Sequence, residues 1–214
     1  MAPLTVLFDL DGTLVDSEVG ILEGFRRATG AVGLRPDEEA IRRWIGPPLE
    51  MSLLEVGVDP SDIPAAVAAY RSFYGAEGLY QATVYDGIED SLDALRSAGA
   101  TLAVTTAKLV DFAETIVAHF GLDRYFPVVR GAGSDGLVDK AHIVAGALAD
   151  LGRPSPEHTA LVGDRRYDMA AAAANGLRAV GVSWGYGSVQ ELQDAGAAVI
   201  VDKPSDLPAE LLGS

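Results

Sequence analysis

The chain has 214 residues, of which 49% are hydrophobic and 22% charged, so it can form one globular core with a modest insert, and intrinsic disorder is excluded. Its 16 basic and 31 acidic side chains give a formal net charge of −15, the opposite sign to that of a general nucleic-acid or anionic-membrane binder. It contains no cysteine, which excludes disulfides, thiolate metal sites and a thiol nucleophile.

No stretch approaches the roughly 18 unbroken apolar residues that a membrane-spanning helix needs. The N-terminal residues 1–4 run directly into a strand pattern and lack the charged, apolar and small-residue order of a secretion signal. We therefore expect a cytoplasmic protein that binds neither nucleic acid nor membrane. The sequence indicates no oligomeric state.

Continuous apolar runs, partly β-branched, predict the buried strands of a parallel sheet. They occupy residues 4–8, 101–106, 126–130, 159–162, 178–182 and 197–201. Helical patterns lie between them at residues 88–98, 140–151 and 168–175. Alternation of strand and helix predicts an α/β fold, a Rossmann-like parallel sheet core with helices on both faces.

Residues 17–84 interrupt this alternation, because they contain helical patterns and no convincing strand run. The predicted helices span residues 18–30, 38–45, 49–56 and 61–74. We therefore expect a Rossmann-like core domain made of residues 1–16 and 85–214, with residues 17–84 inserted as an α-helical cap of four helices. The joints are predicted at Asp16–Ser17 and at residues 84–87.

The segment Asp9-Leu10-Asp11-Gly12-Thr13 stands where the first predicted strand ends. Ligands of open parallel sheets bind beyond the carboxyl ends of the strands. Two carboxylates two residues apart point the same way in extended chain, so a cation or a shared proton must relieve their repulsion. A simple Asp- and Gly-rich turn is the alternative. A calcium loop is excluded, because its fifth and twelfth positions, counted from Asp9, are Thr13 and Gly20.

Asp164 follows another predicted strand, and Asp168 comes four residues later, near the start of a helix. Asp168 taken alone also suits an N-capping role. Together with Asp9, these carboxylates would converge on one edge of the sheet and form a hard-cation site, of the kind that holds Mg²⁺ with a carbonyl, waters and a phosphate.

Two further segments have the chemistry to bind a phosphate at the same edge. Thr106 and Ala107 end the strand at 101–106, where a hydroxyl and free backbone N–H groups can hold phosphate oxygens. Lys140 opens a helix after the glycine-rich loop 131–136, so its ammonium opposes the helix dipole and is either solvated or aimed at an anion. Only three of the 16 basic residues are lysines (108, 140 and 203), so a lysine kept at a specific place can be there for its compact charge.

These segments resemble, in order and rough spacing, the four motifs of the haloacid dehalogenase-like hydrolase superfamily, and the resemblance spans nearly the whole chain. The helical insert is similar to the cap of the phosphoglycolate phosphatase-like branch. Segments 45–49 and 184–187 also resemble segments of that branch. One departure is Ala107, where many relatives carry Asn. Alanine keeps the backbone N–H at this position, but any contact made by the Asn side chain is lost.

The resemblance implies a mechanism and a set of roles. Asp9 is expected to be the nucleophile that forms an aspartyl-phosphate, and Asp11 the acid and base that protonates the leaving alcohol and then activates water. The implied ligands of Mg²⁺ are Asp9, the Asp11 carbonyl and Asp164. The implied phosphate-binding groups are Thr106, the Ala107 N–H and Lys140, with Asp168 in the second shell of the site.

The expected function is therefore a Mg²⁺-dependent phosphatase that hydrolyses a small phosphorylated metabolite and is phosphoglycolate phosphatase-like. Asp11 argues against a haloacid dehalogenase proper and against a phosphonatase. A phosphosugar mutase of the β-phosphoglucomutase kind and a 5'-nucleotidase-type activity stay open. A catalytically idle binding protein is disfavoured by the intact set of acidic residues and Lys140. In the cap, Arg42 or Arg43 could bind a second anionic group of the substrate, although a solvated surface position is the favoured interpretation for each arginine.

Overall fold

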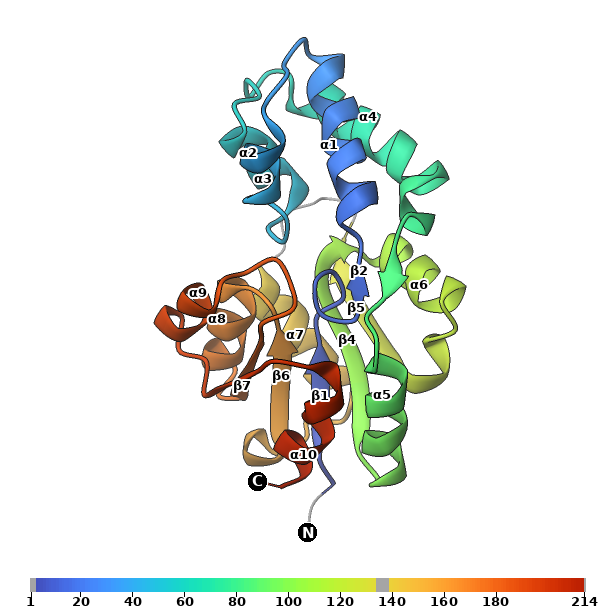
Figure 1. Ribbon diagram of the computed structural model, residues 1–214, viewed down its shortest axis with the longest axis vertical. Helices are drawn as coiled ribbons and strands as arrows, with labels where there is room; N and C mark the ends of the chain where they lie inside the picture. The colour runs from blue at the N-terminus through green and yellow to red at the C-terminus, as the bar shows by residue number, and fades with distance from the viewer. Residues whose placement is uncertain (1–2, 134–138, 214) are drawn as a thin grey trace.

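A six-stranded parallel sheet forms the centre of the protein (Figure 1). The computed structural model describes residues 3–133 and 139–213. Along the sheet the strand order is β5-β4-β1-β6-β7-β8. The strands are β1 (Thr5–Phe8), β4 (Thr101–Leu109), β5 (Val128–Ala132), β6 (Thr159–Gly163), β7 (Arg178–Val182) and β8 (Val199–Val201). All six correspond to strands predicted from the sequence.

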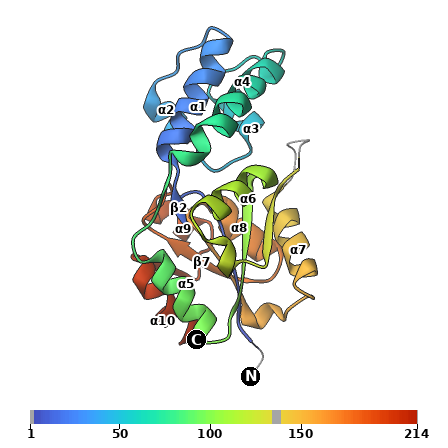
Figure 2. The ribbon, with the colours of Figure 1, turned by 90° about the vertical axis from the view of Figure 1, so that its right-hand side faces the viewer.

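Helices cover both faces of this sheet, because side chains of a strand alternate between its faces. On β1, Val6 and Phe8 belong to one apolar cluster and Leu7 to another. The first face is covered by α5 (Ile88–Ser97), α6 (Val110–His119) and α10 (Leu207–Leu212). The second is covered by α7 (Lys140–Asp150), α8 (Arg166–Ala174) and α9 (Val189–Asp194). Figure 2 shows α5 and α10 on one side of the sheet and α7 on the other.

The helical insert lies beyond the carboxyl end of the sheet, at the top of Figure 1. Its helices are α1 (Glu18–Ala31), α2 (Glu38–Arg42), α3 (Leu49–Glu55) and α4 (Ile63–Ala76). The rings of Phe25 on α1 and Tyr70 on α4 meet edge to face, with centroids 5.6 Å apart. Short 3₁₀ helices occur at Gly78–Tyr80, Asp123–Tyr125, Pro156–His158 and Pro204–Asp206.

A two-stranded antiparallel ribbon, β2 (Val15–Asp16) with β3 (Thr83–Val84), carries both connections between the sheet and the helical insert. The prediction that residues 17–84 contain no strand is wrong for β3. A strand of two residues is too short to leave a periodic hydrophobic pattern. Among the residues that the structure describes, no helix is long and apolar enough to cross a membrane.

Candidate active site

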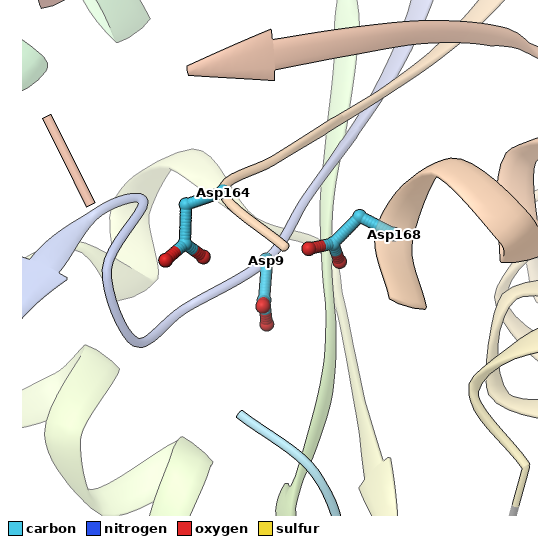
Figure 3. Close-up of side chains that lie close together, drawn as sticks. All are labelled: Asp9, Asp164 and Asp168. Atoms are coloured by element: carbon cyan, nitrogen blue, oxygen red, sulfur yellow. The ribbon is translucent and has the colours of Figure 1, made fainter. Parts of the chain in front are cut away.

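Three aspartates meet where β1 and β6 end. Asp9 continues the sheet by one residue, since its N–H donates to the carbonyl of Val162, 2.9 Å away. Asp164 follows β6, and Asp168 lies in the first turn of α8. One carboxylate oxygen from each lies within 4.8 Å of the other two, and all three side chains are buried (Figure 3). The convergence predicted from the sequence is therefore present.

Lys140, the first residue of α7, provides a positive charge at this cluster. Its Nζ is 2.7 Å from Oδ2 of Asp9 and forms a second ion pair with Oδ1 of Asp168. Its side chain is only 7% exposed. Of the two expectations for this residue, solvated or aimed at an anion, the structure supports the second. The loop that precedes Lys140 lies partly outside the described residues, at 134–138.

The electrostatics of the cluster show how much charge is buried there. Burial raises the pKa of Asp9 to about 7, although the neighbouring Lys140 lowers it. Burial, together with Asp168 and Asp9, raises the pKa of Asp164 well above its ordinary value. Burial lowers the pKa of Lys140, but the carboxylates of Asp168 and Asp9 outweigh it and raise that pKa overall. If all three carboxylates were ionised, the single ammonium of Lys140 would leave two negative charges, which bound protons or a cation must balance.

This arrangement fits a divalent cation. Both oxygens of Asp168 have partners already, Lys140 for Oδ1 and the backbone N–H of Arg165 for Oδ2 at 3.0 Å. Asp164 accepts hydrogen bonds from the N–H of Tyr186 at 2.7 Å and from the hydroxyl of Thr13 at 3.3 Å, which fix its orientation. The buried aspartates provide carboxylate oxygens as ligands and an excess of negative charge, both of which hard cations prefer. The triad can therefore hold a metal ion.

Asp11 lies apart from the triad and takes part in contacts with the helical insert. Its Oδ2 is 3.2 Å from Nζ of Lys108, and its Oδ1 accepts a hydrogen bond from the hydroxyl of Ser17. Nζ of Lys108 also donates to the hydroxyl of Tyr74 on α4, at 2.6 Å. No role was predicted for Lys108, although its identity as one of only three lysines was a usable signal.

A cavity between the sheet edge and the helical insert brings the other predicted residues together. The core side of its lining is Asp9, Asp11, Thr106, Ala107, Lys108, Leu109, Phe112 and Ala132. Thr106 is buried, and its hydroxyl oxygen accepts a hydrogen bond from the N–H of Lys108 at 3.2 Å. β4 extends beyond its last pair with β1, Phe8 with Val104, so the segment at Thr106 and Ala107 lies in the cavity wall.

Of the two interpretations of the cap arginines, the structure supports solvated positions on the surface. Arg42 and Arg43 do not line this cavity. Arg42 is half exposed and pairs with Glu18 and Glu38, and Arg43 is 69% exposed. Arg71 on α4 lines the cavity instead. Sequence periodicity places a residue on a helix face, but which face meets the sheet depends on how the insert packs.

Residues 184–186 and Arg165 of the core contact the loop after β1 and the helical insert. These contacts were not predicted from the sequence. The indole N–H of Trp184 donates to the carbonyl of Thr13 at 3.1 Å, and the hydroxyl of Tyr186 accepts from the N–H of Ser17 at 2.9 Å. The guanidinium of Arg165 donates to the carbonyls of residues 45 and 43 in the insert. The residues next to Asp164 thus also fix the position of the insert.

Comparison with known proteins agrees with this architecture. Residues 6–182 match the model of the haloacid dehalogenase-like hydrolases. Tyrosine-protein kinase PtkA of Mycobacterium tuberculosis is 40% identical over 201 residues, which cover 93% of this chain and 68% of that protein. A 5'-nucleotidase of Pseudomonas aeruginosa is 37% identical, with 88% and 86% covered. A phosphoglycolate phosphatase of Pseudomonas putida is 30% identical, with 99% and 79% covered.

A solved structure extends the match to the complete fold. The crystal structure of a predicted phosphatase from Clostridium acetobutylicum superposes with a TM-score of 0.94 at 34% identity, over 100% of both chains. The chain belongs to the haloacid dehalogenase-like hydrolases and is a phosphatase of that family.

Proposed function

We propose that the protein is a Mg²⁺-dependent phosphatase that hydrolyses a small phosphomonoester through an aspartyl-phosphate on Asp9. Residues 17–84 would act as the cap over a core made of residues 1–16 and 85–214. The observation that carries the proposal is the buried Asp9 carboxylate, paired with Lys140 and lining the same cavity as Asp11 and Thr106.

Asp9 is the proposed nucleophile, because it is the carboxylate of the triad that lines the cavity. Its oxygen bonds to phosphorus while the bond from phosphorus to the leaving-group oxygen breaks. Two repulsive charge pairs between a carboxylate and a phosphate dianion, near 4 Å, cost about 8 kcal/mol at an effective dielectric constant of 20. The ammonium of Lys140 next to Asp9 reduces that repulsion.

Asp11 is the proposed acid and base. It gives a proton to the departing alkoxide and then takes one from the water that attacks the phosphorus of the aspartyl-phosphate. Attack by water releases inorganic phosphate and restores the Asp9 carboxylate. Lys108 and Ser17 hold the Asp11 carboxylate in the cavity, where both transfers must occur.

Asp9, the Asp11 carbonyl and Asp164 are the proposed Mg²⁺ ligands, and the bound ion supplies positive charge toward the phosphate. Thr106, the Ala107 N–H and Lys140 are the proposed phosphate-binding groups. Asp168 would hold the ammonium of Lys140 in position. Its Oδ1 pairs with that ammonium, and its Oδ2 accepts a hydrogen bond from the Arg165 N–H.

Release of inorganic phosphate from an aryl phosphate and from a panel of phosphorylated metabolites tests the proposal. We expect activity with Mg²⁺, none in excess chelator and inhibition by Ca²⁺, whose six to eight ligands at longer distances could hold both Asp9 oxygens. Conversion of a hexose 1-phosphate to its isomer without phosphate release would indicate a mutase instead. Full activity in excess chelator, or with Ca²⁺ alone, would contradict the metal assignment.

A further inference from the structure

Lys108 is a buried lysine in the wall of the cavity, between the sheet and the helical insert. It lies near the end of β4, beyond the last pair of that strand with β1. Its side chain is only 8% exposed. Burying an ammonium is costly unless partners compensate its charge and accept its hydrogen bonds. The partners of its Nζ therefore decide where this ammonium can lie.

Nζ of Lys108 has partners in both parts of the molecule. One is Oδ2 of Asp11, 3.2 Å away, in the loop that follows β1 of the core. Another is the hydroxyl oxygen of Tyr74 on α4 of the insert, 2.6 Å away, which accepts a hydrogen bond. Nζ also lies 4.2 Å from the centre of the Tyr74 ring, within the range of a cation–π contact. Lys108 can keep both partners only while the insert lies against the core.

Tyr74 is a fixed anchor for this contact. Its side chain is fully buried, and its ring stacks on Tyr70 at 5.2 Å and lies 5.7 Å from the ring of Phe112. Burial, with the nearby charge of Asp11, raises the pKa of the Tyr74 hydroxyl well above its ordinary value, so this group stays a neutral phenol. A neutral hydroxyl accepts a hydrogen bond without competing for the positive charge. That charge is thus left for Asp11, while Tyr74 helps to fix the position of the ammonium.

Both oxygens of the Asp11 carboxylate are held by groups whose positions depend on the insert. Lys108 pairs with Oδ2, and the hydroxyl of Ser17 donates to Oδ1. Ser17 stands immediately before α1, the first helix of the insert. A carboxylate that transfers a proton must lie within hydrogen-bond distance of the reacting oxygen. The insert therefore contributes to the orientation of Asp11 through two separate contacts.

We propose that Lys108 is a positioning residue for the acid and base Asp11, and that Tyr74 of the insert holds Lys108 in place. This inference rests on the proposed phosphatase function and adds a residue to it. When Asp11 gives its proton to the departing oxygen, its own O–H bond breaks, an O–H bond to the leaving group forms, and Asp11 becomes an anion. The ammonium of Lys108 lies beside that new charge and stabilises it. Lys108 acts through Asp11 and transfers no proton itself.

Two matched substrates, 4-nitrophenyl phosphate and phenyl phosphate, measure this effect in the presence of Mg²⁺. They have nearly the same shape, but phenolate is the more basic leaving group and depends more on a proton from the acid. Lys108→Met should lower kcat/KM for phenyl phosphate about tenfold more than kcat/KM for 4-nitrophenyl phosphate. An equal loss on both substrates would overturn the inference, because disturbed folding or phosphate binding affects both alike.

Tyr74→Phe tests the link to the insert. This variant removes one hydroxyl and keeps the buried ring, and it should lower the ratio of phenyl to 4-nitrophenyl phosphate kcat/KM about threefold. Added to Lys108→Met, it should cause no further change in that ratio, because its effect passes through Lys108. Tyr80→Phe is the matched control. Tyr80 is another tyrosine of the insert, is 48% exposed and lies outside the described lining of the cavity, so its ratio should stay at the wild-type value.

The outcomes separate this inference from the proposed function. A ratio that Tyr74→Phe leaves unchanged would refute the inference and leave the phosphatase standing, and this milder variant decides the matter if Lys108→Met does not fold. A further drop in the double variant, as large as the one that Tyr74→Phe causes alone, would refute the route through Lys108. A wild-type protein that hydrolyses neither phosphate would refute the proposed function itself. Thermal unfolding of each variant shows which of them fold.

Discussion

Lys140 is the residue on which the charge balance of the site depends. Its Nζ contacts both Asp9 and Asp168, and the three side chains are almost completely buried. Its removal should therefore affect folding as well as catalysis, because removing one partner of a buried ion pair leaves uncompensated charge and costs on the order of 3–5 kcal/mol.

Lys140→Met should therefore reduce both turnover and stability. We expect kcat to fall by about 10²–10³, the typical loss for one group that stabilises transition-state charge. The midpoint of thermal unfolding should fall as well. The exposed Lys203 provides the control, because Lys203→Met removes the same charge from a side chain that is not part of the cluster. Unchanged kcat and kcat/KM in Lys140→Met would assign Lys140 no part in catalysis.

At the scale of elements, the loop between β7 and α9 holds Asp164 in place through close backbone packing. An ideal Cβ added to Gly185 would lie 2.3 Å from the Asp164 Cβ and 2.3 Å from the Gly12 carbonyl oxygen. Neither atom can move without moving the aspartate or the loop that follows β1. Only glycine fits here.

Gly185→Ala should destabilise the protein and weaken metal binding, because the added methyl group displaces Asp164. Gly30→Ala is the matched control: Gly30 lies in α1, and apart from its chain neighbours and its own helix backbone no described atom lies within 4 Å of its added Cβ. The control should gain up to about 1 kcal/mol from its higher helix propensity. The measurement is thermal unfolding of both variants with and without Mg²⁺. Equal stability and an equal Mg²⁺ response in the two variants would contradict the packing argument.

The elements that were predictable are those with a strong local signal. The six strands are continuous apolar runs, so their positions followed from hydrophobic pattern alone. Local signals were insufficient elsewhere. The helix predicted over 38–45 ends at Arg42 in the structure, and α6, α9 and α10 were not identified individually.

The candidate site shows the same division. Aspartates at strand ends converge because parallel strands share an edge, which sequence order can predict. The contacts of Lys108 with Tyr74, and of Arg165 with the carbonyl of Ile45, join residues 34 and 120 positions apart. Nothing in the local sequence specifies such pairs, since they depend on how the insert packs on the sheet.

For the whole molecule, the buried acidic cluster links stability to pH and to metal binding. The native pKa of Asp9 is raised to about 7 from 3.8. Between these values the native state keeps a proton that the unfolded state has lost, so the metal-free protein loses stability from this group as pH rises from about 4 to 7. A cation competes with that proton, so its binding strengthens over the same range.

The rise in unfolding temperature caused by Mg²⁺ should accordingly be larger at pH 8 than at pH 5.5. Differential scanning fluorimetry with Mg²⁺ or chelator, at constant ionic strength, measures it. Asp164→Asn should remove most of the gain at both pH values. An equal or smaller gain at pH 8 would show that the metal does not compete with protons at this cluster.

The central claim is that Asp9 carries the phosphoryl group, and the variant Asp11→Asn tests it most directly. An aryl phosphate has a good leaving group and needs little help from an acid, whereas attack by water on the aspartyl-phosphate needs the base that this variant lacks. Rapid acid quench followed by intact-mass measurement and peptide mapping should find one added phosphoryl group on Asp9, and none in Asp9→Asn. A phosphoryl group on any other residue would contradict the mechanism, as would complete loss of activity in Asp11→Asn with no trapped adduct.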